Sequence, residues 1–408
     1  MNRTIYKRFA SVIVKKGINL QEGQDVLLYI STLQRVFAKY IVEECYKNKA
    51  RKVIINWIDD DIDYVAYKYG DEKALSKVED YEEARAKHNS KSIPCRIYVE
   101  DSDPEAFNGL DNDKISRISM ARRKVIKKYR DITEGYDQWC IVAVPSKAWA
   151  KMIFPNETPA NAVKKLWDAI IKTTRIDTKD PIKQWNEHIE YLASKAKVLN
   201  ELNLDYLEYS SSNGTSLKLK LHEGHLWQSA SENSLRGIEF VANMPTEEVF
   251  TMPDINGVDG VVVSSKPLSH NGVVIDDFKI YFEHGRVVKC EALKGQNELQ
   301  KIIDTDEGSH HLGEVALVPY DSPINLSGIL FYNTLFDENA ACHLALGMAF
   351  RDNLKGYETM SDEEFKKIEF NNSLTHVDFM IGTKDLNIVG YDHNGNKHQI
   401  FKDGNFAF

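Results

Sequence analysis

The first 200 residues alternate between two hydrophobic patterns. Short apolar runs bounded by polar or turn residues predict four buried strands, at 25–30, 52–57, 95–99 and 139–144. Apolar residues at helical spacing predict six helices, over 36–47, 64–77, 81–91, 115–129, 159–171 and 181–199. Strands and helices that alternate over short connections indicate an α/β domain with a mostly parallel sheet.

The pattern changes near residue 200. Runs that alternate apolar and polar residues, or are wholly apolar, predict strands at 206–209, 217–221, 261–263, 278–282 and 287–290. Turn dipeptides separate them, namely Asn213-Gly214, Asn256-Gly257, Asn271-Gly272 and His284-Gly285. We therefore expect an α/β domain over 1–200 and a β-rich α+β domain over 201–408.

Net charge and cysteine content indicate which binding partners and which cellular compartment to expect. A formal net charge of −9 repels phosphate backbones, so nucleic acid is not an expected partner. No stretch approaches the ~20 apolar residues of a membrane helix, and the first residues lack the apolar core of a secretory signal. The 5 cysteines are far apart and form no C-x-x-C motif, which predicts free thiols in a reducing cytoplasm.

Several common catalytic motifs are absent from the sequence. There is no G-x-S-x-G, no G-x-x-x-x-G-K-[ST] and no H-E-x-x-H. The segment after the first predicted strand also lacks the glycines of a dinucleotide-binding turn. The sequence therefore gives no support to a serine hydrolase, a P-loop NTPase, a common mononuclear metalloprotease or a nicotinamide enzyme.

Acids and histidines gather instead in apolar segments of the second half. His376 and Asp378 are two apart in a strand-like run, so both side chains leave on the same side, with Cα atoms roughly 7 Å apart. Because bridged metal pairs are separated by roughly 3.5–4 Å, each residue could hold one metal. A half-exposed edge strand with outward polar residues would give the same pattern.

Three other segments carry candidates with open alternatives. Glu314 lies in an otherwise apolar run, where an ionised carboxylate needs a metal or a buried Arg or Lys partner. Glu247 and Glu248 are adjacent in an extended segment, so only one is expected to face a site. His343 lies in an Ala/Leu-rich helical pattern, where a core histidine is the simpler interpretation.

The helical pattern around His343 ends near Phe350. Asp337, Glu338 and Asn339 precede it and are predicted to cap this helix. Taken together, the segments supply three carboxylates and two imidazoles without thiolates. That donor set suits a dinuclear hydrolytic site for zinc, cobalt or manganese.

These motifs resemble those of the aminopeptidase T family of metallopeptidases. The likeness covers nearly the whole chain and is most specific at 243–250, 313–318 and 333–347, with further matches at 17–23, 148–150 and 181–188. The resemblance implies an N-terminal α/β domain, a C-terminal catalytic domain enclosing two divalent metal ions, a homodimer, and release of N-terminal residues from peptides with a free N-terminus. It also implies five metal ligands, which are Glu248, Glu314, His343, His376 and Asp378.

One position departs from the family pattern. Seven residues after its ligand histidine, the family has a tyrosine thought to assist catalysis, and this chain has Phe350. Phenylalanine keeps the ring but lacks the hydroxyl that would donate to a developing oxyanion. Loss of such a donor lowers rates roughly 10²–10³-fold in well-studied hydrolases.

The expected function is thus a metal-dependent aminopeptidase that uses a metal-activated water, with Glu314 or Glu247 carrying the proton to the leaving amine. Two other functions are compatible with the sequence. One is a catalytically impaired metal-binding scaffold or dimeric binding protein, for which Phe350 is the indication. The other is a dinuclear hydrolase of a different ester or amide.

Overall fold

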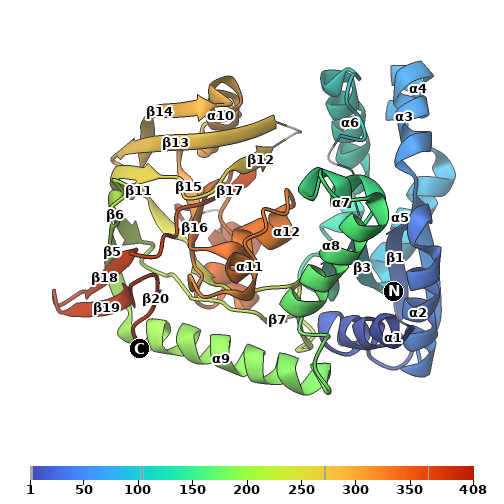
Figure 1. Ribbon diagram of the computed structural model, residues 1–408, viewed down its shortest axis with the longest axis horizontal. Coiled ribbons are helices and arrows are strands. Elements are labelled where there is room, and N and C mark those ends of the chain that lie inside the picture. Colours follow the sequence, from blue (N-terminus) through green and yellow to red (C-terminus); the bar gives the residue numbers. More distant parts are fainter. Residues whose placement is uncertain (1–2, 102, 104, 271–272, 366) are drawn as a thin grey trace. The chain divides into compact units, whose positions relative to one another are not determined.

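A computed structural model describes residues 3–101, 103, 105–270, 273–365 and 367–408 (Figure 1). Contacts between residues divide the chain into two compact units. The first contains the residues up to Trp185 and the segment Glu232–Met244, and the second contains Asn186–Ser231 and Pro245–Phe408. The predicted domain ranges, 1–200 and 201–408, stay a prediction, since contacts do not test which part folds alone.

The first unit contains a five-stranded, wholly parallel sheet in the order β2-β1-β3-β4-β9. Its strands are β1 (Asp25–Ser31), β2 (Lys52–Ile58), β3 (Cys95–Glu100), β4 (Trp139–Ala143) and β9 (Asn243–Met244). Nearly every position of β1 is buried, which is typical of a parallel strand covered on both faces. The parallel sheet predicted from the sequence is confirmed, and the late strand β9 is an addition that the pattern did not predict.

Helices surround this sheet. They are α1 (Arg3–Val12), α2 (Arg35–Lys47), α3 (Asp60–Tyr69), α4 (Glu72–Ser76), α5 (Asp80–Ser92), α6 (Asn112–Arg130), α7 (Lys147–Ile153) and α8 (Pro159–Thr173), with a π-helical turn at Ile13–Gly17. Of these helices, α3 to α8 begin at polar capping residues. The single helix predicted over 64–77 is two helices. Gly70 is extended there, and the Asp71 side chain accepts a hydrogen bond from the backbone of Ala74, which starts α4.

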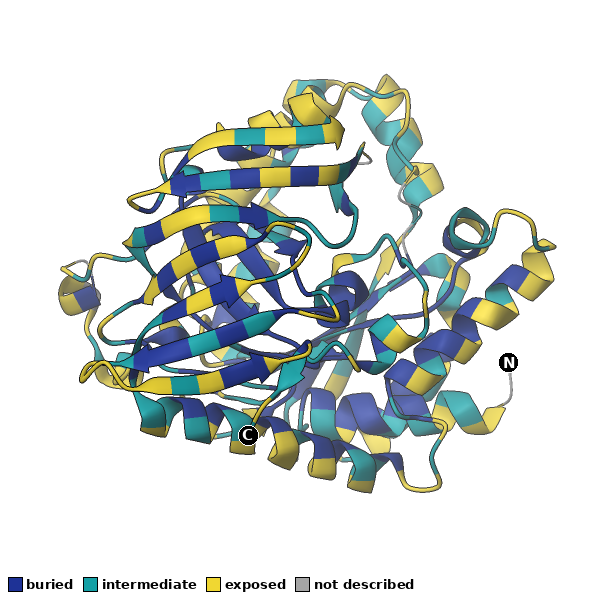
Figure 2. Cartoon of the chain, turned by 60° about the vertical axis from the view of Figure 1, so that its left-hand side comes forward, coloured by how far each residue is buried: buried dark blue, intermediate teal, exposed yellow. Residues whose placement is uncertain are grey.

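The second unit is built around a nine-stranded antiparallel sheet. Its strands are β5 (Leu204–Ser210), β6 (Ser216–Leu221), β11 (Pro253–Val263), β12 (Leu268–His270), β13 (Val273–Glu283), β14 (Arg286–Lys294), β18 (Asn387–Asp392), β19 (Lys397–Lys402) and β20 (Asn405–Phe406). Buried and exposed residues alternate along β6, as the pattern predicted and as Figure 2 shows for several strands. The leucines of β6 are buried, and its exposed positions include Lys218 and Lys220.

Two of the four predicted turns are not found as turns in the described residues. Asn256-Gly257 lies inside β11, where the pairing with β6 shifts register between Pro253 and Val258, so the predicted turn is wrong and a bulge takes its place. The turn predicted at Asn271-Gly272 lies outside the described residues.

A second sheet of four antiparallel strands packs on the same core. Its order is β10-β15-β16-β17, with β10 (Val249–Thr251), β15 (Leu312–Leu317), β16 (His343–Gly347) and β17 (His376–Met380). One face carries apolar side chains that join the core of the large sheet, among them Val315, Leu344 and Phe379. The opposite face is therefore available for chemistry.

Helices of the second unit are mostly short. They are α10 (Gln296–Ile303), α11 (Pro323–Leu326), α12 (Thr334–Asp337) and α13 (Asp362–Phe365), together with α9 (Pro181–Leu202), which starts in the first unit. Among the described helices, none combines the length and apolar composition that crossing a bilayer requires. All five cysteines are free, as the sequence predicted.

His225 is a buried histidine in the second unit. Its ring is 2 % exposed, Nδ1 lies 2.8 Å from the backbone oxygen of His222, and Nε2 has no partner among the described residues. Burial lowers the pKa of His225 from 6.5 to about 4. Above pH 6.5 both folded and unfolded states hold a neutral ring, and below it the unfolded state takes up the proton first.

We therefore expect stability to fall as the pH decreases from 6.5 to about 4, by up to about 3 kcal/mol from this residue. Denaturant unfolding of the wild type and of His225→Gln at pH 7 and pH 4.5 measures it. The variant should lose less stability on acidification. Equal losses in the two proteins would show that His225 does not cause the acid sensitivity.

Candidate metal centre

Three neighbouring strands carry four of the five predicted ligands. Glu314 is on β15, His343 is on β16, and His376 and Asp378 are on β17. Glu248 directly precedes β10, which pairs with β15. Because all four strands are adjacent, residues far apart in the chain meet on one face of a single sheet.

Backbone pairing sets these residues in rows across the strands. Glu314 pairs with Ala345, and Ala345 pairs with Asp378, so a small side chain separates the two carboxylates. His376 pairs with Gly347, whose φ is 103°. A Cβ on Gly347 would lie 2.1 Å from a backbone oxygen, so only glycine fits there. The small residues of β16 leave room for the ligand side chains.

A bulge at Gly313 turns Glu314 toward this face. Leu312 pairs with Leu346, whereas Glu314 pairs with Ala345, so the register shifts by one residue between them. Leu312 and Leu346 belong to the apolar core. Without the shift, Glu314 would share the core face with Leu312, since alternate residues of a regular strand face the same way. The bulge therefore decides which side of the sheet holds the carboxylate.

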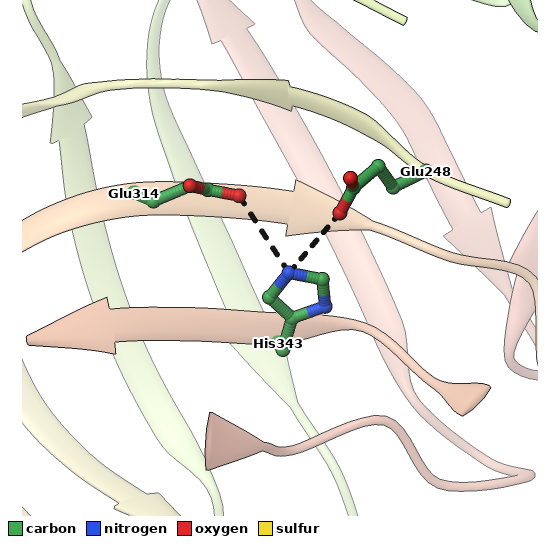
Figure 3. A group of neighbouring side chains, drawn as sticks. All are labelled: Glu248, Glu314 and His343. Carbon is green, nitrogen blue, oxygen red and sulfur yellow. Dashed lines mark ion pairs between the residues drawn. The ribbon is translucent and has the colours of Figure 1, made fainter. Parts of the chain in front are cut away.

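The first group of converging side chains consists of Glu248, Glu314 and His343 (Figure 3). Nε2 of His343 lies 3.2 Å from Oε2 of Glu248 and 3.6 Å from Oε1 of Glu314. One ligand atom from each residue fits within a mutual distance of 4.8 Å. All three residues are buried, and His343 is only 1 % exposed.

The second group consists of Glu314, His376 and Asp378, and it shares Glu314 with the first. Nε2 of His376 lies 3.2 Å from Oε2 of Glu314 and 3.2 Å from Oδ1 of Asp378. Oδ1 of Asp378 is also 4.0 Å from Nε2 of His343. The two oxygens of Glu314 therefore face different histidines, which is the arrangement of a bridging carboxylate.

The carboxylates of the cluster raise the pKa of both histidines. Burial by itself would lower the pKa of His343, but hydrogen bonds to Glu248 and Glu314 outweigh it and raise the pKa well above 6.5. Burial opposes protonation of His376 too, and the charge and hydrogen bonds of Asp378 and Glu314 raise its pKa well above 6.5. A divalent cation would replace these protons.

The pKa values of the three carboxylates shift in different directions, lowered for Glu314 and Asp378 and raised for Glu248. Burial would raise the pKa of Glu314, but hydrogen bonds from His343 and His376 lower it. For Asp378 the charge of His376 likewise outweighs burial, and its pKa is lowered. Burial prevails at Glu248, whose pKa is raised despite the hydrogen bond from His343, because Glu314 and Asp378 add repulsion.

Backbone carbonyls fix the orientation of both imidazoles. Nδ1 of His376 lies 2.7 Å from the oxygen of Met348, and Nδ1 of His343 lies 3.3 Å from the oxygen of Ala341. A hydrogen on Nδ1 leaves Nε2 free to face the cluster, as expected for metal-binding histidines.

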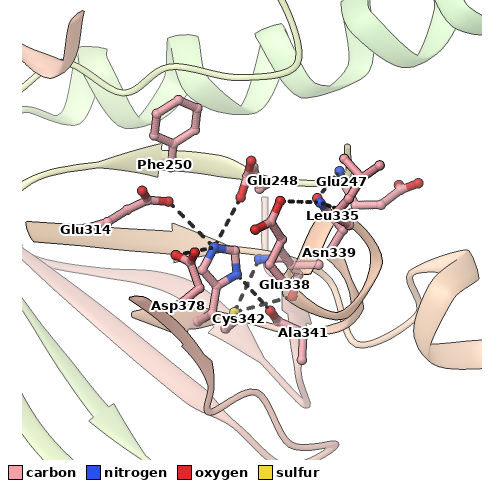
Figure 4. Close-up of polar contacts among 12 residues, drawn as sticks. Glu247, Glu248, Phe250, Glu314, Leu335, Glu338, Asn339, Ala341, Cys342 and Asp378 are labelled. Carbon is pink, nitrogen blue, oxygen red and sulfur yellow. Dashed lines mark hydrogen bonds and ion pairs between the residues drawn. The ribbon is translucent and has the colours of Figure 1, made fainter. Parts of the chain in front are cut away.

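Glu247 is placed differently from its neighbour. Its side chain runs away from Glu248 (Figure 4), and one carboxylate oxygen lies 3.6 Å from Nε2 of His188 on α9. Its backbone N–H donates to Oδ1 of Asn339 at 2.7 Å. The two adjacent glutamates face opposite ways, as the extended segment predicted.

The predicted helix around His343 is wrong. Residues His343–Gly347 form the central strand β16, with Leu344 and Leu346 in the core and His343, Ala345 and Gly347 on the ligand face. Alanine and leucine favour helices in isolation, but pairing with strands on both sides decides the conformation here. The predicted capping residues lie instead in α12 and the following 3-10 turn, Glu338–Ala340.

Phe350 lies against the cluster. Its ring centroid is 4.6 Å from that of His376, at an interplanar angle of 44°. The position at which the family has a tyrosine is thus beside a predicted ligand, and this chain supplies no hydroxyl there.

Comparison with known proteins identifies the family. The sequence model of the thermophilic metalloprotease (M29) family matches residues 2–406. The chain belongs to the M29 metalloprotease family. It is 43 % identical to aminopeptidase AmpS of Bacillus subtilis over 98 % of both chains. It is 39 % identical to aminopeptidase PepS of Streptococcus thermophilus over 98 % of this chain and 97 % of the relative.

A solved structure agrees over the full length. Wild-type AmpT from Thermus thermophilus matches with a TM-score of 0.91 at 34 % identity, covering 100 % of this chain and 99 % of that chain. The resemblance to the aminopeptidase T family is therefore confirmed, as are the parallel sheet of the first unit and the antiparallel sheets of the second.

The donor set fits what an M29 metalloprotease requires. Carboxylates and imidazoles without thiolates suit zinc, cobalt or manganese in a hydrolytic centre.

The structure also places at the cluster a carboxylate that the sequence did not predict as a site residue. Glu338 lies beside Glu248 and Asp378 (Figure 4), and burial next to these charges raises its pKa well above 4.5. The sequence predicted Glu338 as a helix cap, because this residue precedes an expected helix.

Proposed function

We propose that this M29 chain is an aminopeptidase that depends on two divalent metal ions. The observation that supports it best is the sharing of Glu314 between two groups of ligand atoms. Glu248 and His343 would complete one metal site, and His376 and Asp378 the other. Zinc, cobalt and manganese all suit these donors.

When bound, a metal pair polarises a carbonyl and lowers the pKa of water toward neutrality. The protein's own groups then orient the reaction. Carbonyl partners hold the rings of His343 and His376 in one orientation, and Glu248, Glu314 and His343 are buried. Of the two carboxylates expected to carry the proton to the leaving amine, Glu314 lies within the cluster whereas Glu247 faces His188. Glu314 is therefore nearer than Glu247 to the atoms that would react.

The substrates proposed are peptides with a free N-terminus, because AmpS of Bacillus subtilis and PepS of Streptococcus thermophilus are aminopeptidases. A homodimer and a cytoplasmic location also belong to the proposal. Likeness to the family supports the dimer, and five free thiols support a reducing compartment.

A second candidate is a metal-binding scaffold with impaired catalysis. Phe350 favours it, since the ring beside His376 lacks a donor. Both candidates require the same metal centre and differ only in turnover.

Metal removal tests the proposed activity. Dialysis against a strong chelator should abolish hydrolysis of L-leucine p-nitroanilide, because the proposed nucleophile is a water that the metals activate. Adding Zn²⁺, Co²⁺ or Mn²⁺ should restore it. Full activity in protein shown to be metal-free by mass spectrometry would refute metal dependence.

Metal stoichiometry tests the shared carboxylate. Wild-type protein should bind two ions, and Glu314→Ala should bind neither tightly, because both sites lose a ligand. Glu248→Ala should leave the site of His376 and Asp378 largely intact, and serves as the comparison. Calorimetric titration with Zn²⁺ measures the number bound. One ion retained by Glu314→Ala at wild-type affinity would contradict the bridge.

The Phe350→Tyr variant distinguishes an active aminopeptidase from a metal-binding scaffold with impaired catalysis. The new hydroxyl would stand beside His376 and could donate to the oxyanion, so we expect kcat to rise roughly 10- to 100-fold. Phe350→Leu is the control that changes the ring without adding a donor. Absence of turnover in the wild type and in Phe350→Tyr, both loaded with metal, would favour the scaffold.

A further inference from the structure

Phe250 places an aromatic ring on the face of the small sheet that carries the ligands. It lies on β10, two residues after Glu248, and side chains two apart in an extended chain face the same way. Val249, between them, belongs to the apolar core. Figure 4 shows the ring of Phe250 beside the carboxylates of Glu248 and Glu314. An apolar side chain thus borders the charged cluster.

Backbone pairing sets Phe250 in the same row as a ligand. Phe250 pairs with Ala316 on β15, and Ala316 pairs with His343 on β16. Because adjacent strands are roughly 4.8 Å apart, the Cα atoms of Phe250 and His343 are separated by about 10 Å. The first side chain of a peptide branches from the carbon atom next to the carbonyl that reacts. A large side chain at that position would come within reach of the Phe250 ring.

The protein itself covers the ring of Phe250 only in part. Phe250 is half-buried, whereas Val249 and Met252, close to it in the chain, are completely buried. Among the described residues, Phe250 is in neither the core of the second unit nor the smaller apolar cluster around Met252, and it contacts no other aromatic ring. The ring of Phe350, in contrast, lies against His376. Phe250 therefore has apolar surface that no part of the described core uses.

The half-buried ligands mark the side from which solvent reaches the cluster. They are His376 and Asp378, and the other three ligands are buried. Met348 and Phe350 are also half-buried and lie beside His376, where the Met348 oxygen is 2.7 Å from Nδ1 and the Phe350 ring centroid is 4.6 Å from the imidazole. Sites for small ligands combine mostly apolar walls with a few polar groups. Apolar side chains beside the metal ligands have this character.

The backbone of Phe250 is held on both sides. On one side β10 pairs with β15. On the other side, the N–H of Phe250 donates to the Gln228 oxygen at 3.1 Å, and the Phe250 oxygen accepts from the Gln228 N–H at 2.9 Å. Nδ2 of Asn353 also donates to the Phe250 oxygen, at 3.4 Å. A residue that selects substrates needs such a rigid position relative to the reacting groups.

We propose that Phe250 contacts the side chain of the first residue of the substrate, so that the centre favours peptides that begin with a large apolar residue. The inference rests on the proposed aminopeptidase function and adds the class of N-terminal residue. Contact with the ring removes apolar surface of both partners from water, and the gain increases with the size of the substrate side chain.

The Phe250→Ala variant tests this contact with three substrates. Wild-type protein should hydrolyse L-phenylalanine and L-leucine p-nitroanilides with a higher kcat/KM than L-alanine p-nitroanilide. In Phe250→Ala, kcat/KM for the two large substrates should fall roughly 10- to 100-fold, mostly through KM. For the alanine substrate it should change by less than about threefold. Bound metal should stay at the wild-type amount.

Two further variants separate substrate contact from a general loss of packing. Phe250→Leu keeps a large apolar side chain and should retain most of the preference for large residues. Phe370→Ala is the matched control, because Phe370 is another half-buried phenylalanine of the second unit, with its ring 4.4 Å from that of Phe365. Its ratio of kcat/KM for the leucine and alanine substrates should equal the wild-type ratio.

Binding without turnover gives an independent measurement. L-leucinol and L-alaninol have the free amine and no scissile bond, and they differ in the size of the side chain. Calorimetry on metal-loaded protein should show a roughly 10-fold or larger loss of L-leucinol affinity in Phe250→Ala and an almost unchanged affinity for L-alaninol.

Two results would overturn the proposal. One is an equal fall of kcat/KM for all three substrates in Phe250→Ala, with or without loss of metal, since that is the effect of a structural residue. The other is a wild-type ratio of the leucine to the alanine substrate in this variant.

Failure of the underlying function would look different. Metal-loaded wild-type protein that hydrolyses none of the three anilides contradicts the aminopeptidase itself. L-leucinol binding still tests Phe250 in that case, because it needs no turnover, and equal affinity of wild type and Phe250→Ala overturns the contact.

Discussion

The burial of like charges beside one another is the constraint on which this structure depends. Glu248, Glu314 and Asp378 lie within one cluster of the second unit, where both glutamates are buried and Asp378 is half-buried. Each ionised carboxylate costs several kcal/mol to bury without compensation. Two histidines supply partial compensation, because the carboxylates raise the pKa of each imidazole well above 6.5 although burial alone would lower it. Divalent cations would satisfy the same carboxylates more completely, so the electrostatics of the cluster support the proposed metal centre as its geometry does.

The sheet meets this constraint with a few backbone devices. The bulge at Gly313 turns one carboxylate out of the apolar core, and Gly347 and Ala345 keep the central strand narrow between its neighbours. The leucines on the opposite face of the same strands pack into the large core. A rigid scaffold on one side thus positions charged groups on the other, and the outer contacts of Asn339 extend that order to Glu338.

The sequence predicted the parts whose signal is local. Buried runs gave the strands of the parallel sheet, and the spacing of His376 and Asp378 gave a shared face. The strand of His343 was missed because the alanine and leucines around this histidine carry a helical propensity, which pairing with neighbouring strands overrides. Glu338 was missed because a carboxylate near an expected helix start resembles a cap, and only the tertiary structure reveals what surrounds it. The ligand set came from the family resemblance, and residue spacing alone left it open.

Anomalous diffraction from crystals loaded with zinc tests the central claim most directly. Data collected on both sides of the zinc absorption edge should show two peaks roughly 3.5–4 Å apart, with Glu314 contacting both. A single peak, or two peaks without a shared Glu314, would contradict the bridged centre proposed for this chain.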